Sequence, residues 1–224
     1  MKLLLLPGMD GTGRLFRRFV EVLPAHLMAV VASYDAQTRM SSDELLNQLP
    51  RLDEPHVIVG ESFSGPLAVR CAAGNSNVRG VVLVASFVQP PRPFLSTLAT
   101  LGTLLFRRPP PRLLVREVLL GGAVADALVD EVRDAIASVR PDVLTFRLRQ
   151  LGVVDVRPEL AQLNCPLLYL RARRDRLVPA TCGARVVATG ARRSLIDVDT
   201  GHLIVQSRPV ESAQHVDDFI RTLA

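Results

Sequence analysis

The chain of 224 residues contains a single lysine, Lys2, although lysine and arginine together number 27 against 22 acidic residues. With Lys2 alone there is no GxxxxGK phosphate loop and no candidate for lysine-dependent reductase chemistry, and a Schiff base would have to form on Lys2 itself. The formal net charge of +5 therefore comes almost entirely from arginine. Composition alone argues against several classes of nucleotide-dependent and lysine-dependent enzyme.

Cysteine and aromatic residues are also scarce. The three cysteines have neither the number nor the spacing of a disulfide framework or a zinc site. We therefore expect a cytoplasmic protein that needs no metal and no cofactor. The aromatic side chains amount to eight phenylalanines and two tyrosines. They do not interleave with a basic stripe, so nucleic acid is not an expected partner.

Long apolar runs are missing as well. No segment approaches the ~20 apolar residues that a membrane span requires. The run Lys2–Leu6 meets Pro7 and Gly8 instead of a signal-peptide cleavage site, so it is interpreted as a buried strand. With 48% apolar and 22% charged residues, the chain has the composition of a globular domain.

Short apolar runs of strand length recur along the chain and alternate with helical patterns. The runs are almost continuously apolar, which suits strands that are covered on both faces of a parallel sheet. The alternation predicts an α/β fold with a predominantly parallel, doubly wound sheet. The expected strands are Lys2–Leu6, Met28–Ser33, His56–Gly60, Gly80–Ala85, Leu167–Arg171 and Ser194–Val198.

Residues 88–151 interrupt this rhythm. Their apolar residues keep helical periods, and two proline-rich stretches, Gln89–Pro93 and Arg107–Arg112, punctuate them. We expect roughly four short helices joined by proline turns. An insertion of this kind is placed over the carboxyl edge of the sheet, where such sheets bind ligands. The expected division is a core of residues 1–87 and 152–224 with a helical cap, or lid, of residues 88–151.

The octapeptide VGESFSGP, residues 59–66, joins an expected strand to an expected helix. Gly60 permits the tight turn and, with Ser64, brackets Ser62 as G-x-S-x-S. A serine at the tip of such a turn exposes its hydroxyl, and the N–H of Phe63 at the helix start can stabilise an oxyanion. Ser62 is therefore the expected nucleophile. Ser64 is the rival, and a serine-rich helix cap is the structural alternative.

A serine hydroxyl needs a base, and the base needs an orienting partner. Of the four histidines, only His202 follows a strand at the carboxyl edge; the others are His26, His56 and His215. Asp175 lies in the loop after the strand Leu167–Arg171, whereas the loop after the preceding strand has no acid. Asp199 could assist, and Asp175 could instead form an ion pair with a neighbouring arginine.

The order Ser62, Asp175, His202 on a parallel sheet resembles the α/β-hydrolase superfamily, over residues 2–86 and about 155–223. The loop Leu6–Gly11 after the first strand is similar to the oxyanion loop of that family, with Pro7 where histidine is commoner. The resemblance implies that the Met9 N–H is a second oxyanion donor beside Phe63. The insertion corresponds to the variable cap of the family.

The expected function is that of a serine hydrolase that cleaves a small-molecule acyl ester or thioester through an acyl-enzyme on Ser62. Acyl transfer to an acceptor other than water is the alternative on the same fold. A dinucleotide-binding reductase, suggested by the glycines of residues 8–13 and by Asp35, and a non-catalytic ligand-binding protein are further alternatives. An arginine cluster on the cap suggests either a solvated face or a site for an anionic acyl carrier. The cluster consists of Arg107, Arg108, Arg112 and Arg116.

Overall fold

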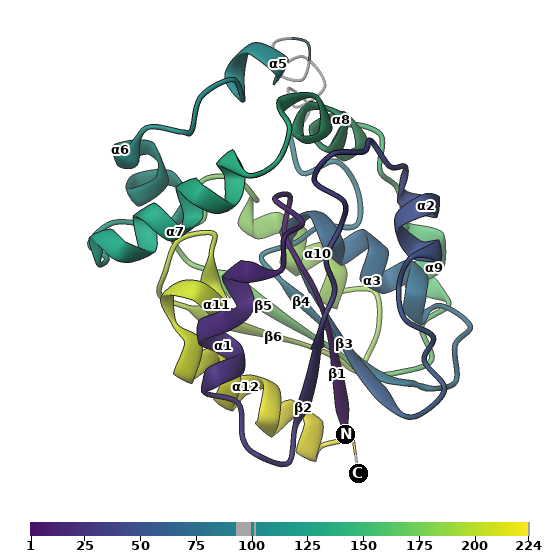
Figure 1. The fold of residues 1–224 in the computed structure, drawn as a ribbon. Helices are drawn as coiled ribbons and strands as arrows, with labels where there is room; N and C mark the ends of the chain where they lie inside the picture. Colours follow the sequence, from purple (N-terminus) through teal and green to yellow (C-terminus); the bar gives the residue numbers. More distant parts are fainter. Residues whose placement is uncertain (93–99, 101, 224) are drawn as a thin grey trace.

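The computed structural model describes residues 1–92, 100 and 102–223. Its centre is a six-stranded parallel sheet with the strand order β2-β1-β3-β4-β5-β6 (Figure 1). This arrangement confirms the predicted fold class, and the strands differ from the expected ones only at their ends. They are β1 (Lys2–Leu6), β2 (Met28–Val31), β3 (His56–Glu61), β4 (Val78–Val84), β5 (Leu167–Ala172) and β6 (Arg193–Val198).

Helices cover both faces of the sheet, and alternate residues of each strand pack against opposite faces. On β1, Leu4 and Leu6 belong to one apolar cluster, whereas Leu3 and Leu5 belong to the other. The first cluster is completed by α2 (Ser42–Asn47), α3 (Gly65–Ala72), α9 (Arg157–Ala161) and α10 (Ala180–Val187). The second is completed by η1 (Arg14–Phe16), α1 (Arg17–Glu21), α11 (Ile204–Ser207) and α12 (Pro209–Arg221). A short 3-10 turn, η2 (Ser62–Ser64), links β3 to α3.

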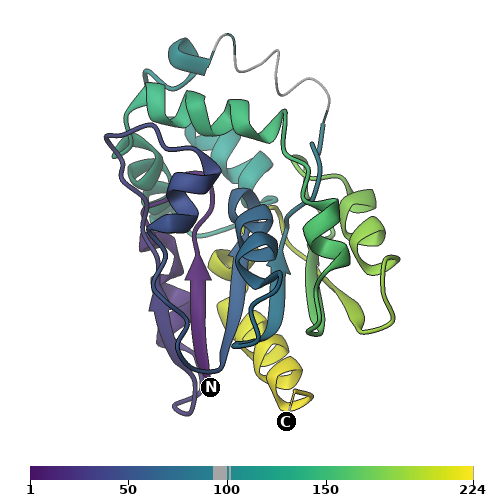
Figure 2. The same cartoon turned by 90° about the vertical axis from the view of Figure 1, so that its right-hand side faces the viewer.

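The insertion, residues 88–151, is helical in its described part and lies over the carboxyl ends of the strands (Figures 1 and 2). Residues 93–99 and 101, including Pro93 of the first proline-rich stretch, lie outside the described residues. Proline precedes α6 at Pro111 and begins α8 at Pro141, as expected for proline turns. The elements are α5 (Gly102–Leu105), α6 (Arg112–Leu114), the π-helical turn η3 (Val115–Leu119), α7 (Asp126–Ala137) and α8 (Pro141–Leu151).

The insertion is anchored to the core by apolar contacts. Val115, Leu120 and Val129 form a buried cluster with Leu203, which follows β6. Among the described residues, no helix has the length and apolar character to cross a membrane. A cytoplasmic location stays a prediction.

Candidate active site

Ser62 stands at the turn between β3 and α3 in a backbone conformation that is unusual for serine. Its φ of 47° lies in the left-handed region, which residues other than glycine seldom adopt. Gly60 allows the tight turn, because a Cβ there would lie 2.7 Å from the Cβ of Ala68. Gly65 is equally constrained, because its Cβ would lie 1.8 Å from the hydroxyl oxygen of Ser86. Both glycines therefore hold the strand and helix close enough for Ser62 to project from the sheet edge.

The two serines of the turn have different surroundings. The Ser62 hydroxyl oxygen lies 2.7 Å from Nε2 of His202 and lines a cavity beneath the insertion. Ser64 is fully buried, and its hydroxyl donates to the carbonyl oxygen of Pro7. The Tyr34 hydroxyl, 2.7 Å from that of Ser64, supplies the second hydrogen bond. Only Ser62 is open to the cavity, whereas Ser64 is used within the fold.

His202 and Asp175 come from the loops that follow β6 and β5, which are neighbouring strands. His202 Nδ1 lies 2.7 Å from Oδ2 of Asp175, and both side chains are 5% exposed. The other carboxylate oxygen, Oδ1, accepts the backbone N–H groups of Leu177 and Val178. A continuous hydrogen-bonded chain therefore runs from Ser62 through His202 to Asp175. The carboxylate is held in place at both oxygens.

The charge on Asp175 acts on the imidazole. Burial alone would lower the pKa of His202, but the adjacent Asp175 carboxylate outweighs burial, so the pKa is raised above its ordinary value. Two of the neighbouring arginines that could have paired with Asp175 are engaged elsewhere: Arg174 pairs with Asp199, and Arg176 lies 4.0 Å from Glu117. Asp199 therefore does not assist the histidine.

The three remaining histidines lie away from Ser62. His26 Nε2 is 2.8 Å from an Asp217 oxygen on α12, and His56 Nδ1 hydrogen-bonds the Glu54 carbonyl at 2.6 Å. His215, also on α12, lies 3.9 Å from Glu211. Of the four histidines, His202 is the one whose ring hydrogen-bonds the Ser62 hydroxyl.

The loop after β1 passes beside Ser62. Gly8, Met9 and Asp10 line the same cavity as Ser62 and His202. The loop is a tight turn, because the Gly11 N–H donates to the Gly8 carbonyl at 3.0 Å. The Phe63 N–H belongs to the first turn of η2, where N–H groups have no partner within the helix. The two amides that the sequence suggested as oxyanion donors thus belong to segments that border Ser62.

The cavity has a volume of about 270 Å³ and mostly apolar walls. Leu119, Val132, Ile136, Leu144 and Leu148 contribute from the insertion. From the core, Phe87 and Val178 complete the walls beside Ser62 and His202. The arrangement leaves the Ser62 hydroxyl at the floor of a pocket that suits a small apolar group.

A sequence profile of the Alpha/beta hydrolase family matches residues 3–215. The chain belongs to the alpha/beta hydrolase family. The predicted resemblance is therefore confirmed. Curated relatives of this hydrolase include pimeloyl-[acyl-carrier protein] methyl ester esterases from two genera. The protein from Xanthomonas oryzae pv. oryzae is 29% identical over 80% of this chain and 78% of its own length. The protein from Xylella fastidiosa is 26% identical over 99% of this chain and 95% of its own length.

Solved structures with low sequence identity share the fold. An esterase from Thermogutta terrifontis superposes with a TM-score of 0.83 at 17% identity, covering 100% of this chain and 90% of its own. The enol-lactonase from Burkholderia xenovorans LB400 gives 0.80 at 15% identity, covering 98% and 91%. At such identities the likeness concerns the fold.

The structure of this hydrolase also reveals a supporting residue that the sequence reading passed over. Ser86, in the loop after β4, is fully buried, and its hydroxyl donates to the Ser62 carbonyl at 2.6 Å. The Ser86 carbonyl in turn accepts the Tyr169 hydroxyl. The sequence analysis required an acid in the loop after β4 and found none. The signal for Ser86 was a serine at the carboxyl end of a strand.

Glu61, the residue before Ser62, is a second buried polar residue beside the site that the sequence analysis did not single out. Its side chain is 2% exposed and accepts a hydrogen bond from Gln206 Nε2 at 3.1 Å. Burial raises its pKa to about 7, against the opposing effect of the Gln206 hydrogen bond. The carboxyl group also lies near Gly8, because a Cβ on Gly8 would be 3.7 Å from Oε2. An acid inside the G-x-S-x-S motif was the signal available in the sequence.

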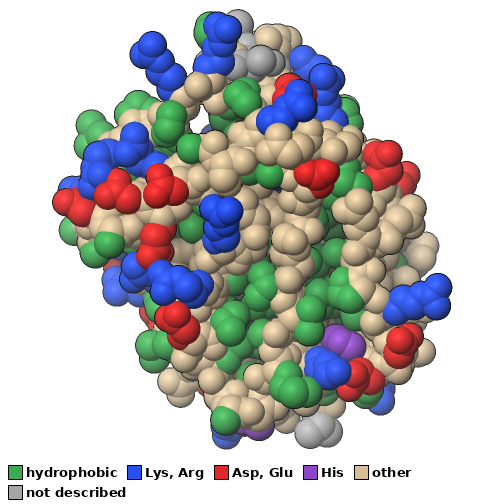
Figure 3. All heavy atoms as spheres, in the orientation of Figure 1, with side chains coloured by type: hydrophobic (Ala, Val, Ile, Leu, Met, Phe, Trp, Pro, Cys, Tyr) green, Lys and Arg blue, Asp and Glu red, His purple; other side chains and the backbone are tan. Residues whose placement is uncertain are grey.

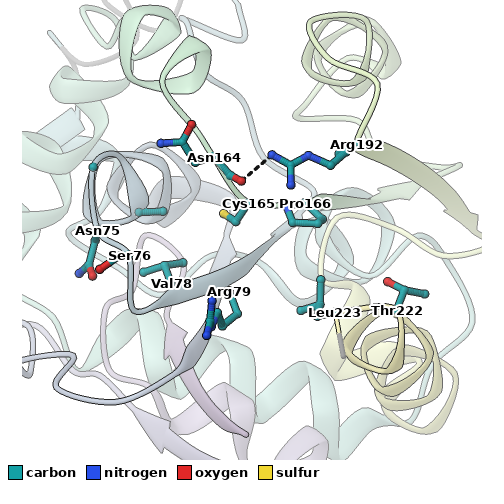
Figure 4. Close-up of a pocket in the computed structure, with 12 residues that line it drawn as sticks. Asn75, Ser76, Val78, Arg79, Asn164, Cys165, Pro166, Arg192, Thr222 and Leu223 are labelled. Atoms are coloured by element: carbon teal, nitrogen blue, oxygen red, sulfur yellow. Dashed lines mark hydrogen bonds between the residues drawn. The ribbon is translucent and has the colours of Figure 1, made fainter.

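A larger hollow, about 590 Å³, lies at the amino ends of the strands, opposite the carboxyl ends where Ser62 lies (Figure 4). Its lining includes Arg79, Cys165 and Arg192, and the Arg192 side chain donates to the Asn164 carbonyl at 2.5 Å. These residues precede or begin strands, whereas Ser62 follows one. The hollow therefore plays no part in the site around Ser62.

Proposed function

We propose that this hydrolase cleaves acyl esters or thioesters through an acyl-enzyme on Ser62, with His202 as general base and acid and Asp175 as its orienting carboxylate. The observation that carries the proposal is the position of His202. Its two ring nitrogens each lie 2.7 Å from an oxygen, one of Ser62 and one of Asp175. This is the relation between nucleophile, base and orienting acid that serine hydrolases require.

The reaction would proceed in two halves. His202 Nε2 takes the Ser62 proton as the oxygen attacks the acyl carbonyl, while Asp175 accepts the Nδ1–H and stabilises the imidazolium. The N–H groups of Met9 and Phe63 bind the oxyanion of the tetrahedral intermediate. The imidazolium then protonates the departing alcohol or thiol, and His202 activates water to release the acid. No metal or cofactor takes part in these steps.

We further propose that residues 88–151 act as a cap on a core of residues 1–87 and 152–224. Helices α7 and α8 contribute Val132, Ile136 and Leu148 to the cavity wall, whereas the reactive groups all come from the core. The cap therefore sets which acyl group fits. Apolar walls around about 270 Å³ favour a short or medium acyl chain.

The leaving group is inferred from the relatives and from charge. Relatives at 26–29% identity are named as esterases of an acyl-carrier-protein substrate. Basic side chains gather over α5 and α6 (Figure 3). Arg112 and Arg116 are already paired with Asp130 and Asp126. That leaves the exposed pair Arg107 and Arg108 as the part of the cluster that suits an anionic carrier.

Two expected alternatives are less well supported. The Asp35 carboxylate accepts the Gln37 N–H and the Thr38 hydroxyl, which gives it a local role in place of ribose binding. A non-catalytic binding protein would not need the hydrogen bonds that link Ser62, His202 and Asp175. Acyl transfer would use the same acyl-enzyme, but the named relatives are esterases, so water is the favoured acceptor.

The assignment is tested with a fluorophosphonate probe and a short p-nitrophenyl ester. Ser62→Ala is expected to lose probe labelling and to lower kcat by a factor on the order of 10⁶, as loss of a serine nucleophile does elsewhere. Ser64→Ala is the matched control two residues away, and it should still be labelled at Ser62. Labelling of Ser64 in the wild type, or full turnover by Ser62→Ala, would refute the assignment.

A further inference from the structure

Helix α8 carries an arginine on its apolar side. Arg147 lies on one stripe with Val143, Leu144 and Leu148, is 2% exposed, and is the largest fully buried side chain among the described residues. Burying a cation is costly unless its donors are satisfied. A leucine or methionine would fill the same space at lower cost, so the charge calls for a reason.

Arg147 donates three hydrogen bonds to backbone carbonyls of the core. Nη1 donates to Met9 at 3.0 Å and to Asp10 at 2.8 Å, and Nη2 donates to Asp35 at 2.9 Å. Within the described part of the chain, no acidic side chain forms an ion pair with this guanidinium. The guanidinium also lies 5.7 Å from the Tyr34 ring centre, within cation–π range. Two of its three hydrogen bonds are thus directed at the loop after β1, and the third reaches the segment after β2.

That loop is held from several sides. Ser64 donates to the Pro7 carbonyl, and the Gly11 N–H donates to the Gly8 carbonyl. Because a peptide group is planar, a fixed Gly8 carbonyl also directs the Met9 N–H that shares its plane. Arg147 fixes the next two carbonyls, those of Met9 and Asp10. The peptides on both sides of the proposed oxyanion donor therefore have little freedom.

Gly11 shows how closely the arginine is fitted to the loop. Its φ is 70°, and a Cβ at this position would lie 2.5 Å from Nη1 of Arg147. The loop thus bends around the guanidinium at a residue with no side chain. Arg147 itself does not line the cavity, whereas its neighbours Leu144 and Leu148 do. Its contacts are to the loop and not to the space for substrate.

We propose that Arg147 is a positioning residue through which helix α8 of the insertion aligns the Met9 peptide for oxyanion binding, an inference that rests on the proposed hydrolase function. The insertion then has two separate tasks. Its apolar side chains shape the acyl cavity, and one arginine organises a backbone donor of the core. Displacement of α8 would open the cavity and loosen the oxyanion donor together.

The test compares Arg147→Met with Arg147→Lys and with Arg149→Met, an exposed arginine two residues along α8. Complete removal of one oxyanion donor costs about 10²–10³ in kcat, so a loosened donor should cost about 10- to 100-fold in Arg147→Met with little change in KM. Lysine keeps a charged donor for the loop carbonyls and should recover part of the loss. Arg149→Met should match the wild type.

A binding comparison separates positioning from general damage. Butylboronic acid forms a negatively charged tetrahedral adduct with a serine hydroxyl that depends on the oxyanion donors, whereas the neutral carbonyl of butyramide gains little from them and binding rests mainly on the acyl cavity. Arg147→Met should weaken boronic acid binding about as much as kcat falls and leave butyramide binding unchanged. Equal loss for both ligands, or unchanged kcat in a folded variant, would overturn the proposal.

Two further controls remove ambiguity. If Arg147→Met does not fold, the same ratio of the two affinities is measured for Arg147→Lys, and a ratio equal to that of the wild type would reject the positioning role. If the wild-type protein is not labelled at Ser62 by fluorophosphonate, the proposed hydrolase function itself has failed. Failure of the Arg147 proposal, by contrast, leaves wild-type labelling intact.

Discussion

Two regions of this hydrolase face the same cavity but are built differently: the carboxyl edge of the sheet and the insertion over it. The edge places Ser62, Asp175 and His202 at the ends of hydrogen-bonded strands, so their backbone positions follow from strand register. The insertion is held by side-chain packing and by the hydrogen bonds of Arg147. In the mechanism that we propose, the edge supplies the reacting groups and the insertion determines which substrate reaches them.

The largest effect in the following set is expected at the edge. Asp175→Asn should lower kcat by about 10⁴, the loss found for the equivalent change in a serine protease, because an amide favours the wrong imidazole tautomer. The measurement is steady-state hydrolysis of a p-nitrophenyl ester. Asp199→Asn is the control, since that acid pairs with Arg174 and not with His202. Near-normal kcat in Asp175→Asn would show that Asp175 at the carboxyl edge is not needed for the chemistry.

The Asp175→Asn variant should also change how kcat/KM depends on pH. His202 must be neutral to act as a base, and its pKa is raised mainly by Asp175 against the opposing effect of burial. Wild-type kcat/KM should therefore fall as pH drops through a value above the ordinary histidine pKa. In Asp175→Asn the acid limb of the residual activity should move to lower pH. An unmoved limb would mean that another group controls it.

A change in the insertion should alter selectivity instead of chemistry. Ile136→Trp on α7 adds bulk to the cavity wall and should lower kcat/KM for longer acyl chains about tenfold or more, while acetyl esters are little affected. Ala137→Trp, on the exposed side of the same helix, is the matched control. An equal loss for all chain lengths would show that the insertion also acts on the reactive groups.

The smallest effect is expected on the outer surface of the insertion. Removing Arg107 and Arg108 together should raise KM for an acyl-carrier-protein substrate by a few-fold at low salt and leave p-nitrophenyl esters unaffected. Replacing the ion-paired Arg112 and Arg116 provides the control. If both pairs of substitutions have equal effects, or if salt makes no difference, docking of an anionic carrier at Arg107 and Arg108 is wrong.

Much of the edge could be predicted because strand and turn signals are local. The apolar run before Gly60 and the helical pattern after it predicted a turn at Ser62, and the structure has one there. Strand ends were less certain: β2 was expected to continue to Ser33 but ends at Val31. There the chain leaves the edge of the sheet toward Tyr34, whose N–H bonds to Gly11.

The insertion was predictable as helical but not in detail. The proline-rich stretch of residues 107–112 predicted the break before α6. The π-helical turn Val115–Leu119 had no signal in the apolar pattern. Arg147 is marked in the sequence as a charge on an otherwise apolar stripe. Nothing in the sequence indicated which backbone carbonyls it would bind, and these lie 137 and 138 residues away.

The sequence by itself determined the order of strands and helices, the hydrolase family and the three residues offered for chemistry, because periodicity and turn residues act over a few neighbours. The tertiary structure decided that Ser62 faces the cavity while Ser64 is buried, and that a helix of the insertion supports a loop of the core. Those outcomes depend on hydrogen bonds between segments that are distant in the sequence, from 30 residues for Ser64 and Tyr34 to 140 for Ser62 and His202. Such bonds form only once the sheet and its helices have packed.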